Sequence, residues 1–313
     1  MTAPARLLQL SGVVIDLIYH VDALPEQGGE AMVNKFQTAP GGGFNAMVAA
    51  RRSKMDVTYA GAIGAGPFGD MVANALAAEG IDRLRPRAPK GCDQGCCTVM
   101  IEPSGERTFV AAEGVEGQVT PMDLDRLYLP EFGWSLLSGY ALYYQGSREA
   151  FASWLTSDVA IPNLVFDPSP LVASIQADLR AAALARAVWV SANAAEAAIL
   201  TGNEDPETAA RALAEGRPAH GGAVVRTGAD GCVIATGGEA QIVPAHRVQP
   251  VDTNGAGDTH LGAFIAALAR GEPPLRAALC ANVAAALSTT AYGPATAPNL
   301  ATINRMLKLR QAG

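Results

Sequence analysis

Charged side chains are scarce in this 313-residue sequence: Asp, Glu, Lys and Arg together make up 17% of the chain. The formal net charge is −7 at pH 7, and the sequence contains no stripe of Lys and Arg. Because a nucleic-acid surface needs clustered positive charge, this composition argues against a nucleic-acid partner. An anionic substrate would need a local cation or a metal ion.

Long apolar runs are also missing. The N-terminal stretch MTAPARLLQLSGVVIDLIYH is interrupted by Gln9 and Ser11 and ends its apolar run at Asp16, with no small-residue cleavage site after it. No segment has the roughly 20 consecutive apolar residues that span a bilayer as a helix. The sequence therefore predicts no signal peptide, no membrane partner and a cytoplasmic location.

Signatures of metal binding and redox chemistry are weak. The five cysteines, at positions 92, 96, 97, 232 and 280, have no histidine close in sequence that would complete a zinc site. An odd number of cysteines favours free thiols. The motif G-x-x-x-x-G-K-[ST] is absent, which argues against a P-loop kinase.

Short apolar runs alternate with helical patterns along most of the chain. Strands are predicted at 6–16, 57–64, 164–170, 187–192, 223–228 and 232–237, and helices at 44–54 and 68–81. This alternation predicts an α/β fold, in which helices cover both faces of a mostly parallel sheet. No linker divides the sequence, so we expect a single domain over residues 1–313.

Residues 95–114 break the alternation. They contain two strand-like runs around EPSGE, in which Pro103 and Gly105 suit a β-turn. With residues 30–42, this hairpin is predicted to form a small antiparallel sheet outside the main body. Such a sheet could cover an active site or make a dimer contact.

The segment VDTNGAGDTHLGAFIAALARG, residues 251–271, carries the main chemical signal. Gly255, Ala256 and Gly257 directly precede Asp258, where a helix is predicted to begin. A helix N-terminus with small residues offers free N–H groups that a phosphate can approach closely. A helix cap would explain Asp258 but not the small residues. A general base acting on an attacking hydroxyl explains both, so the segment predicts phosphoryl transfer.

The segment GAGPFG, residues 64–69, matches the dinucleotide-binding pattern G-x-G-x-x-G. Pro67 removes one backbone donor from this loop, and no acidic residue follows at the expected distance. A dinucleotide-dependent oxidoreductase is therefore a minor alternative.

Two motifs together resemble the signatures of a known family. PGGGFNAMVAARR at 40–52 and DTNGAGDTHLGAF at 252–264 are similar, in order and separation, to the motifs of the ribokinase-like (PfkB) carbohydrate kinases. The resemblance implies a three-layer α/β/α fold with a β-sheet lid formed by about 30–42 and 95–114. It also implies ATP- and Mg²⁺-dependent transfer of the γ-phosphate to a hydroxyl, usually a primary one.

The resemblance also implies roles for individual residues on the acceptor side. Asp258 would be the general base, and the N–H groups at 255 to 258 would hold the developing negative charge. The residues implied for binding the sugar hydroxyls are Asp16, Gly42, Gly43 and Asn45. By themselves, Asp16 would be a strand-end turn residue and Asn45 a helix N-cap.

A second set of residues is implied for the nucleotide and its ions. The residues for ATP are Asn193, Thr227, Gly228, Gly231 and Asn282, the last of these near the adenine. Glu196 would lie near Mg²⁺ and reach it through water, although a pair spaced like Asn193 and Glu196 is commonly a solvated helix face. Asp252 lies in a segment that resembles the family's monovalent-cation site, and activation by K⁺ is left open.

Departures from the family pattern bear on the substrate. Phe44 and a shortened first loop put ribose in doubt, and the Asn254 side chain is expected to face away from the site. The first motif contains no Lys or Arg before its last two residues, so the predicted acceptor is an uncharged sugar, with a nucleoside as the alternative. Arg107 on the lid is the one cation expected to approach the acceptor.

A homodimer formed through the lid is expected. The alternative from a different functional class is a sugar-binding regulator that has lost its catalytic activity.

Overall fold

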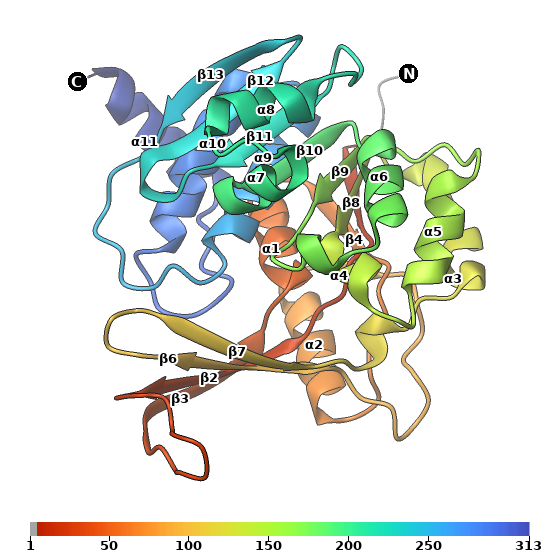
Figure 1. Ribbon diagram of the computed structural model, residues 1–313, viewed down its shortest axis with the longest axis vertical. Coiled ribbons are helices and arrows are strands. Elements are labelled where there is room, and N and C mark those ends of the chain that lie inside the picture. The colour runs from red at the N-terminus through yellow and green to blue at the C-terminus, as the bar shows by residue number, and fades with distance from the viewer. Residues whose placement is uncertain (1–4, 313) are drawn as a thin grey trace.

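The predicted β/α alternation forms a nine-stranded sheet in the computed structural model, which describes residues 5–312 (Figure 1). In spatial order its strands are β13 (Glu239–Pro244), β12 (Gly231–Thr236), β11 (Gly222–Arg226), β10 (Trp189–Asn193), β9 (Leu164–Asp167), β8 (Trp134–Ser138), β1 (Arg6–Gln9), β4 (Asp56–Tyr59) and β5 (Asp82–Arg83). Neighbours from β11 to β5 are parallel, whereas β12 and β13 form an antiparallel edge. The predicted mostly parallel sheet is confirmed, but β5, β8 and β13 were not predicted from the sequence.

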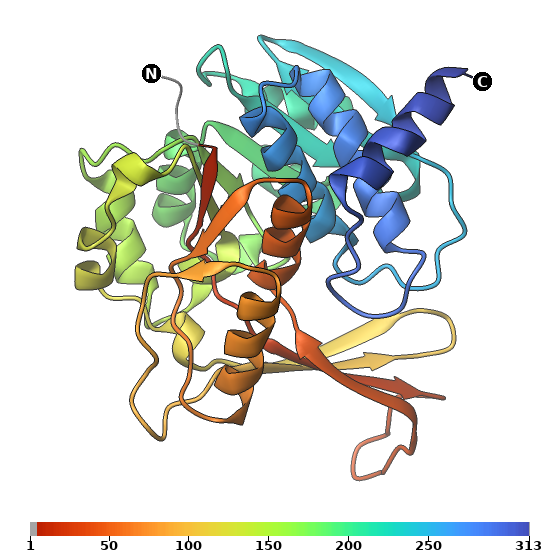
Figure 2. The same ribbon diagram turned by 180° about the vertical axis from the view of Figure 1, so that it is seen from behind.

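Helices cover both faces of this sheet, as predicted (Figures 1 and 2). One face carries α1 (Gly43–Arg52), α2 (Pro67–Ala78), α9 (Ala256–Ala269), α10 (Pro274–Ser288) and α11 (Leu300–Ala312). The other carries α3 (Pro121–Asp125), α4 (Gly139–Tyr143), α5 (Arg148–Thr156), α6 (Ala177–Arg186), α7 (Ala194–Thr201) and α8 (Pro206–Ala214). Because side chains alternate along a strand, Leu7 of β1 packs in the first core and Leu8 in the second. None of the helices within residues 5–312 is long and apolar enough to cross a membrane.

A second, four-stranded sheet extends from the main body and lies at the bottom of Figure 1. Its strand order is β3 (Val33–Pro40), β2 (Ile15–Val21), β6 (Cys96–Ile101) and β7 (Arg107–Ala112). The hairpin β6–β7 turns at Glu102, whose carbonyl accepts from the Gly105 N–H at 2.9 Å, as the Pro–Ser–Gly sequence predicts. Residues 30–42 and 95–114 thus contribute three of the four strands.

The prediction of one strand over residues 6–16 is wrong. The run divides into β1 in the main sheet and β2 in the small sheet, where β2 pairs with β3 antiparallel and with β6 parallel. Residues on both sides of the break are buried, including Leu10 and Val13, so hydropathy alone does not reveal it. The break places Asp16 at the start of a small-sheet strand rather than at the end of a main-sheet strand.

Helices α1 and α9 cross at close range near the centre of the molecule. A Cβ added at Gly262 of α9 would lie 2.1 Å from the carbonyl oxygen of Ala46 in α1, so only glycine fits at this crossing. The crossing brings the N-terminal ends of two helices together, although they lie more than 200 residues apart in sequence. Asn45 and Asp258, one near each of these ends, are thereby placed side by side.

Candidate active site

A cavity of about 430 Å³ opens between the main sheet and the small sheet. Because three aspartates line it, Asp16, Asp167 and Asp258, we call it the aspartate cavity. It lies at the carboxyl ends of β1, β8 and β9, which is where open α/β sheets place their ligands. Gly42, Gly43 and Asn45 also line it, so all four residues implied for the acceptor meet there.

Asp258 and Asn45 do not act as helix caps. Gly255 is the N-cap of α9, with a left-handed φ of 70° that favours glycine, and Asp258 follows in the first turn. Gly42 is the N-cap of α1, and Asn45 is a buried residue inside the helix. Asn45 Nδ2 donates to Asp258 Oδ2 at 3.3 Å, and Asn45 Oδ1 accepts from the Ala295 N–H at 2.8 Å. The capping explanation for each residue is therefore wrong.

The aspartates of this cavity hold their protons more tightly than ordinary carboxyl groups. Burial raises the pKa of Asp258 to about 7, with a further rise from Asp167 that Asn45 and Arg226 partly offset. Burial also raises the pKa of Asp16 to about 7, against a hydrogen bond from the Asn254 side chain. A carboxylate with a pKa near neutrality can accept a proton during a reaction at physiological pH.

Asn254 was expected to face away from the site, and this expectation is wrong. Its side chain hydrogen-bonds to Asp16, and the residue lines the aspartate cavity. The Asn254 N–H donates to Asp252 Oδ1 at 2.9 Å, and this hydrogen bond stabilises the turn of the loop. The side-chain amide of Asn254 faces the cavity. Asn254 is thus a further polar group at the proposed acceptor position.

A second cavity, of about 530 Å³, lies on the other side of the α9 N-terminus. Gly228, Gly231 and Gly257 line it, so we call it the glycine cavity. Among the described residues, Thr227 is not part of its wall, whereas Asn193 and Asn282 are. Asn282 is buried, and its amide donates to the Val243 carbonyl at 2.8 Å. This amide therefore supports the wall of the cavity rather than being free for a ligand.

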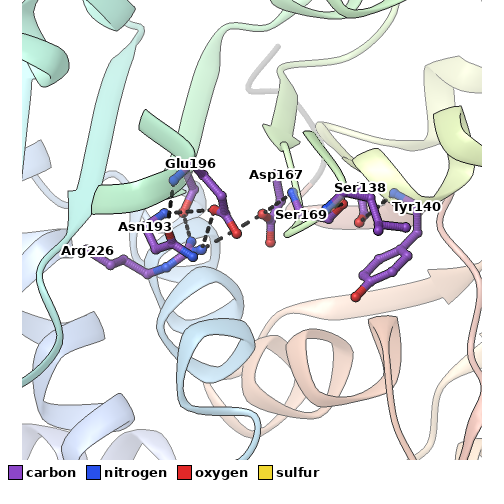
Figure 3. Close-up of polar contacts among 9 residues, drawn as sticks. Ser138, Tyr140, Asp167, Ser169, Asn193, Glu196 and Arg226 are labelled. Carbon is purple, nitrogen blue, oxygen red and sulfur yellow. Dashed lines mark hydrogen bonds and ion pairs between the residues drawn. The ribbon is translucent and has the colours of Figure 1, made fainter. Parts of the chain in front are cut away.

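Asn193 and Glu196 form a capping box at the start of α7 rather than a solvated helix face. Glu196 N–H donates to Asn193 Oδ1, and Asn193 N–H donates to Glu196 Oε2, both at 2.8 Å. Glu196 is only 4% exposed, and burial raises its pKa to about 7, with a contribution from Asp167. Figure 3 shows Glu196 pointing toward Asp167.

Arg226 is a site residue that was not predicted from the sequence. Its Nη2 lies 3.5 Å from Glu196 Oε2 and 3.8 Å from Asp167 Oδ1 (Figure 3). Its Nη1 donates to Ser191 Oγ at 2.6 Å. Burial raises the pKa of Asp167, and Arg226 opposes this rise. The signal available in the sequence was an Arg at the end of a buried strand, directly before Thr227.

The carboxylates of Asp167 and Glu196, both close to Arg226, form a donor set suited to Mg²⁺. Oxygen ligands from one or two carboxylates, supplemented by phosphate and water, are the usual Mg²⁺ environment. Asp167 Oδ1 and Glu196 Oε2 provide such oxygens, and both lie near Nη2 of Arg226. Within residues 5–312 no group of three or more His, Cys, Asp or Glu side chains is arranged so that it could hold a metal ion, so the protein alone would not enclose the ion.

Asp252 does not fit the suggested monovalent-cation site. Its Oδ1 accepts from Arg107 Nη2 at 3.0 Å and its Oδ2 from the Gly293 N–H at 2.9 Å. Arg107 Nη2 also donates to Thr253 Oγ1 at 3.0 Å. The guanidinium of Arg107 therefore already supplies a positive charge beside Asp252, and it joins strand β7 of the small sheet to the loop before α9.

The dinucleotide-like pattern GAGPFG has a structural explanation at the N-terminus of α2. Asp93 accepts from the N–H groups of Phe68 at 3.1 Å and Gly69 at 2.7 Å, so a carboxylate of the chain itself takes the place of a pyrophosphate at the α2 N-terminus. This arrangement opposes dinucleotide binding by GAGPFG.

The five cysteines are free. Cys232 and Cys280 are buried, and Cys97 lines the aspartate cavity.

Comparisons with known proteins agree with this architecture. The chain is 30% identical over 298 residues to the uncharacterized sugar kinase YegV of Escherichia coli, covering 91% of this chain and 88% of that protein. It is 29% identical over 282 residues to the ribokinase of Bacillus subtilis, covering 89% and 91%. The crystal structure of a Cryptococcus neoformans ribokinase in complex with ADP superposes with a TM-score of 0.80, at 22% identity, covering 96% and 99%. The profile of the pfkB family carbohydrate kinases matches residues 6–301, and the chain therefore belongs to that family.

Proposed function

We propose that this protein is an ATP-dependent kinase that transfers the γ-phosphate to a hydroxyl, usually a primary one, of an uncharged sugar. One observation carries the proposal: the two cavities meet at the N-terminus of α9. Gly257 lines the glycine cavity and the next residue, Asp258, lines the aspartate cavity. A nucleotide phosphate in one cavity and a sugar hydroxyl in the other would therefore meet at the N–H groups of the first turn of α9.

Asp258 takes the proton from the hydroxyl as the hydroxyl oxygen attacks the γ-phosphorus. The N–H groups at 255 to 258 hold the negative charge that develops on the phosphoryl oxygens. Asp16, Asn45 and Asn254 orient the other hydroxyls of the acceptor. Mg²⁺, when bound with ATP, would neutralise phosphate charge, and Glu196 is the residue that would hold it through water.

The charges of the aspartate cavity favour a neutral acceptor. Within the described residues no Lys or Arg lines this cavity, whereas Asp16, Glu113, Asp167 and Asp258 do. A sugar phosphate would bring a second anion beside these carboxylates without a fixed cation to pair with it. Arg107, the one cation that the sequence suggested for this task, is paired with Asp252 instead.

The small sheet is proposed to act both as a lid and as a dimer contact. Strands β6 and β7 carry residues of the aspartate cavity wall, including Cys97 and Phe109, so movement of the sheet would open and close the cavity. The sheet also exposes Val33, Phe36 and Val110. An exposed apolar sheet with free edges is typical of an interface, and a second copy of this chain is the proposed partner.

The free cysteines support the proposed cytoplasmic setting.

A nucleoside kinase is the second candidate, and one observation favours it. Part of the wall of the aspartate cavity is aromatic, formed by Phe109 of β7 together with Tyr140, Tyr143 and Tyr144 at α4. Tyr140 and Tyr144 stack with ring centroids 6.4 Å apart. A flat base would bury its faces against such rings while the pentose hydroxyls contact the polar end. A free monosaccharide would leave part of the aromatic wall uncovered.

The test is an acceptor screen with purified protein, ATP and Mg²⁺, in which release of ADP is measured for neutral sugars, their phosphates and nucleosides. Turnover of a neutral acceptor supports the proposal, and turnover of none, or of sugar phosphates alone, overturns it. Tyr140→Ala separates the two candidates, because it should raise KM for a nucleoside more than for a free sugar. Tyr128→Ala, which alters an exposed tyrosine outside both cavities, is the matched control. Binding of NAD in place of ATP would point to the dinucleotide alternative, and sugar binding without turnover would point to a silent regulator.

A further inference from the structure

Arg226 is held loosely at the boundary between the two cavities. Its side chain is 13% exposed, and its Nη2 lies 3.5 Å from Glu196 Oε2 and 3.8 Å from Asp167 Oδ1. A guanidinium that is locked to a carboxylate makes paired contacts of about 2.7–2.9 Å. The only short contact of Arg226 within the described residues is the one from Nη1 to Ser191 Oγ. Nη2 is therefore close to two carboxylates without being committed to either of them.

The guanidinium also flanks the N–H groups at the start of α9. A Cβ added at Gly257 would lie 3.6 Å from Arg226 Nε and 3.9 Å from its Cζ. Arg226 and Gly257 line the glycine cavity, whereas Asp167 and Asp258 line the aspartate cavity. A phosphoryl group that passes from a nucleotide in the first cavity to a hydroxyl near Asp258 would pass within reach of Arg226.

We propose that Arg226 is a catalytic residue that binds the transferred phosphoryl group. This inference rests on the proposed kinase function. The acceptor oxygen forms a bond to the γ-phosphorus while the bond from phosphorus to the bridging oxygen of ADP breaks. The proton of the acceptor goes to Asp258, and the equatorial oxygens of the phosphoryl group carry the charge. Arg226 and the N–H groups at 255 to 258 hold these oxygens from two sides, because a planar guanidinium suits paired contacts to phosphate.

The alternative is a purely structural role, in which Arg226 only balances the buried carboxyl groups Asp167 and Glu196. The two roles differ in what they predict for nucleotide binding. A phosphoryl contact is lost when the γ-phosphate is absent, so a change at Arg226 should affect an ATP analogue more than ADP. A structural counter-charge would affect ADP and the analogue alike, because both need the same folded cavity.

The experiment measures the affinities of Arg226→Gln for ADP and for AMP-PNP by calorimetry in the presence of Mg²⁺, together with turnover. We expect ADP affinity within about 3-fold of the unmodified protein, AMP-PNP affinity weakened about 10-fold or more, and kcat lowered about 10²–10³-fold. Arg211→Gln is the matched control: it removes an exposed arginine that pairs with Glu207 on α8, outside both cavities. It should leave both affinities and turnover unchanged.

Parallel loss of ADP and AMP-PNP affinity, or normal kcat in Arg226→Gln, would overturn the inference. If Arg226→Gln does not fold, it is combined with Asp167→Asn, which restores the local charge balance. This double variant is compared with Asp167→Asn alone by its affinities for ADP and for AMP-PNP. Equal changes for both nucleotides would again overturn the inference. If the unmodified protein phosphorylates no acceptor, the proposed function fails by itself, and the two affinities still report whether Arg226 contacts the γ-phosphate.

Discussion

Asn45 donates a hydrogen bond to Asp258 at 3.3 Å and thereby joins the two glycine motifs across 213 residues of sequence. The other end of the same amide accepts from the Ala295 N–H, so the Asn45 side chain is held from both ends. A hydrogen bond to a carboxylate stabilises its charged form, and Asn45 accordingly opposes the rise in the pKa of Asp258. The contact thus orients the proposed base and keeps its pKa from rising further.

Asp258→Asn should abolish most activity and at the same time stabilise the fold. Loss of a general base lowers kcat by about 10²–10⁴-fold. The pKa of Asp258 is raised in the folded protein, so its contribution to stability is present at acidic pH and is lost as the pH rises toward about 7. Asparagine avoids this loss, and the free energy of unfolding at about pH 8 should therefore increase by roughly 1 kcal/mol or more. Urea unfolding and steady-state kinetics measure the two effects; Asp125→Asn, an exposed site, should change neither.

Activity and stability should depend on pH in opposite directions. Turnover requires ionised Asp258, so kcat/KM should rise through an apparent pKa of about 7. Asp16 and Glu196 also have raised pKa values of about 7, so their ionisation should lower the free energy of unfolding over the same range. The measurements are kcat/KM and urea unfolding from about pH 5 to 8. An acid limb near the ordinary carboxyl pKa would contradict the assignment of the base.

Gly257→Val should impair catalysis without unfolding the protein. A Cβ at this position meets Arg226 at 3.6 Å, which is ordinary contact, but the two further methyl groups of valine would crowd the wall of the glycine cavity. We expect kcat/KM for ATP to fall by about 10-fold or more. Gly257→Ala is the graded comparison and should lose less. Unchanged ATP kinetics in the valine variant would place the phosphate elsewhere.

Arg107→Gln should weaken acceptor turnover without changing the preference for an uncharged acceptor. The change removes the ion pair that joins β7 to Asp252 and the loop before α9. A partly exposed pair of this kind contributes about 1 kcal/mol, so the expected rise in acceptor KM is about 5-fold. Kinetics with a neutral sugar and with its phosphate are compared, and Arg126→Gln on the surface is the control. Clear turnover of a sugar phosphate that this change abolishes would show that Arg107 binds the acceptor.

Val110→Asp should shift the proposed dimer toward the monomer. Val110 lies on edge strand β7 and is 60% exposed, so a charge there would be buried if two small sheets pair. Sedimentation across a range of protein concentrations gives the oligomeric state. Ile242→Asp is the matched control: Ile242 is 64% exposed on β13, the edge strand of the main sheet. An unmodified protein that is monomeric at every concentration would refute the dimer.

The sequence alone was sufficient where the determining contacts are local. The turn at Gly255 and the first turn of α9 lie within a few residues of each other, so the sequence 254–258 predicts a helix N-terminus that exposes N–H groups beside a carboxylate. The β/α alternation likewise predicted the mostly parallel sheet, because the strands of such a sheet are buried on both faces and read as short apolar runs. These properties follow from steric and hydrophobic rules that act over one turn or one strand.

Other features were decided by contacts between distant segments. The break between β1 and β2 depends on pairing of β2 with β3 and β6, which burial alone does not reveal. Arg226 acquires its position only when β9, β10 and α7 bring Asp167, Ser191 and Glu196 around it. The Asn254 side chain lines the cavity because its partner, Asp16, comes from the other end of the chain. Electrostatic and hydrogen-bond partners that are separated in sequence are set by the packing of the elements, and no local pattern of residues specifies them.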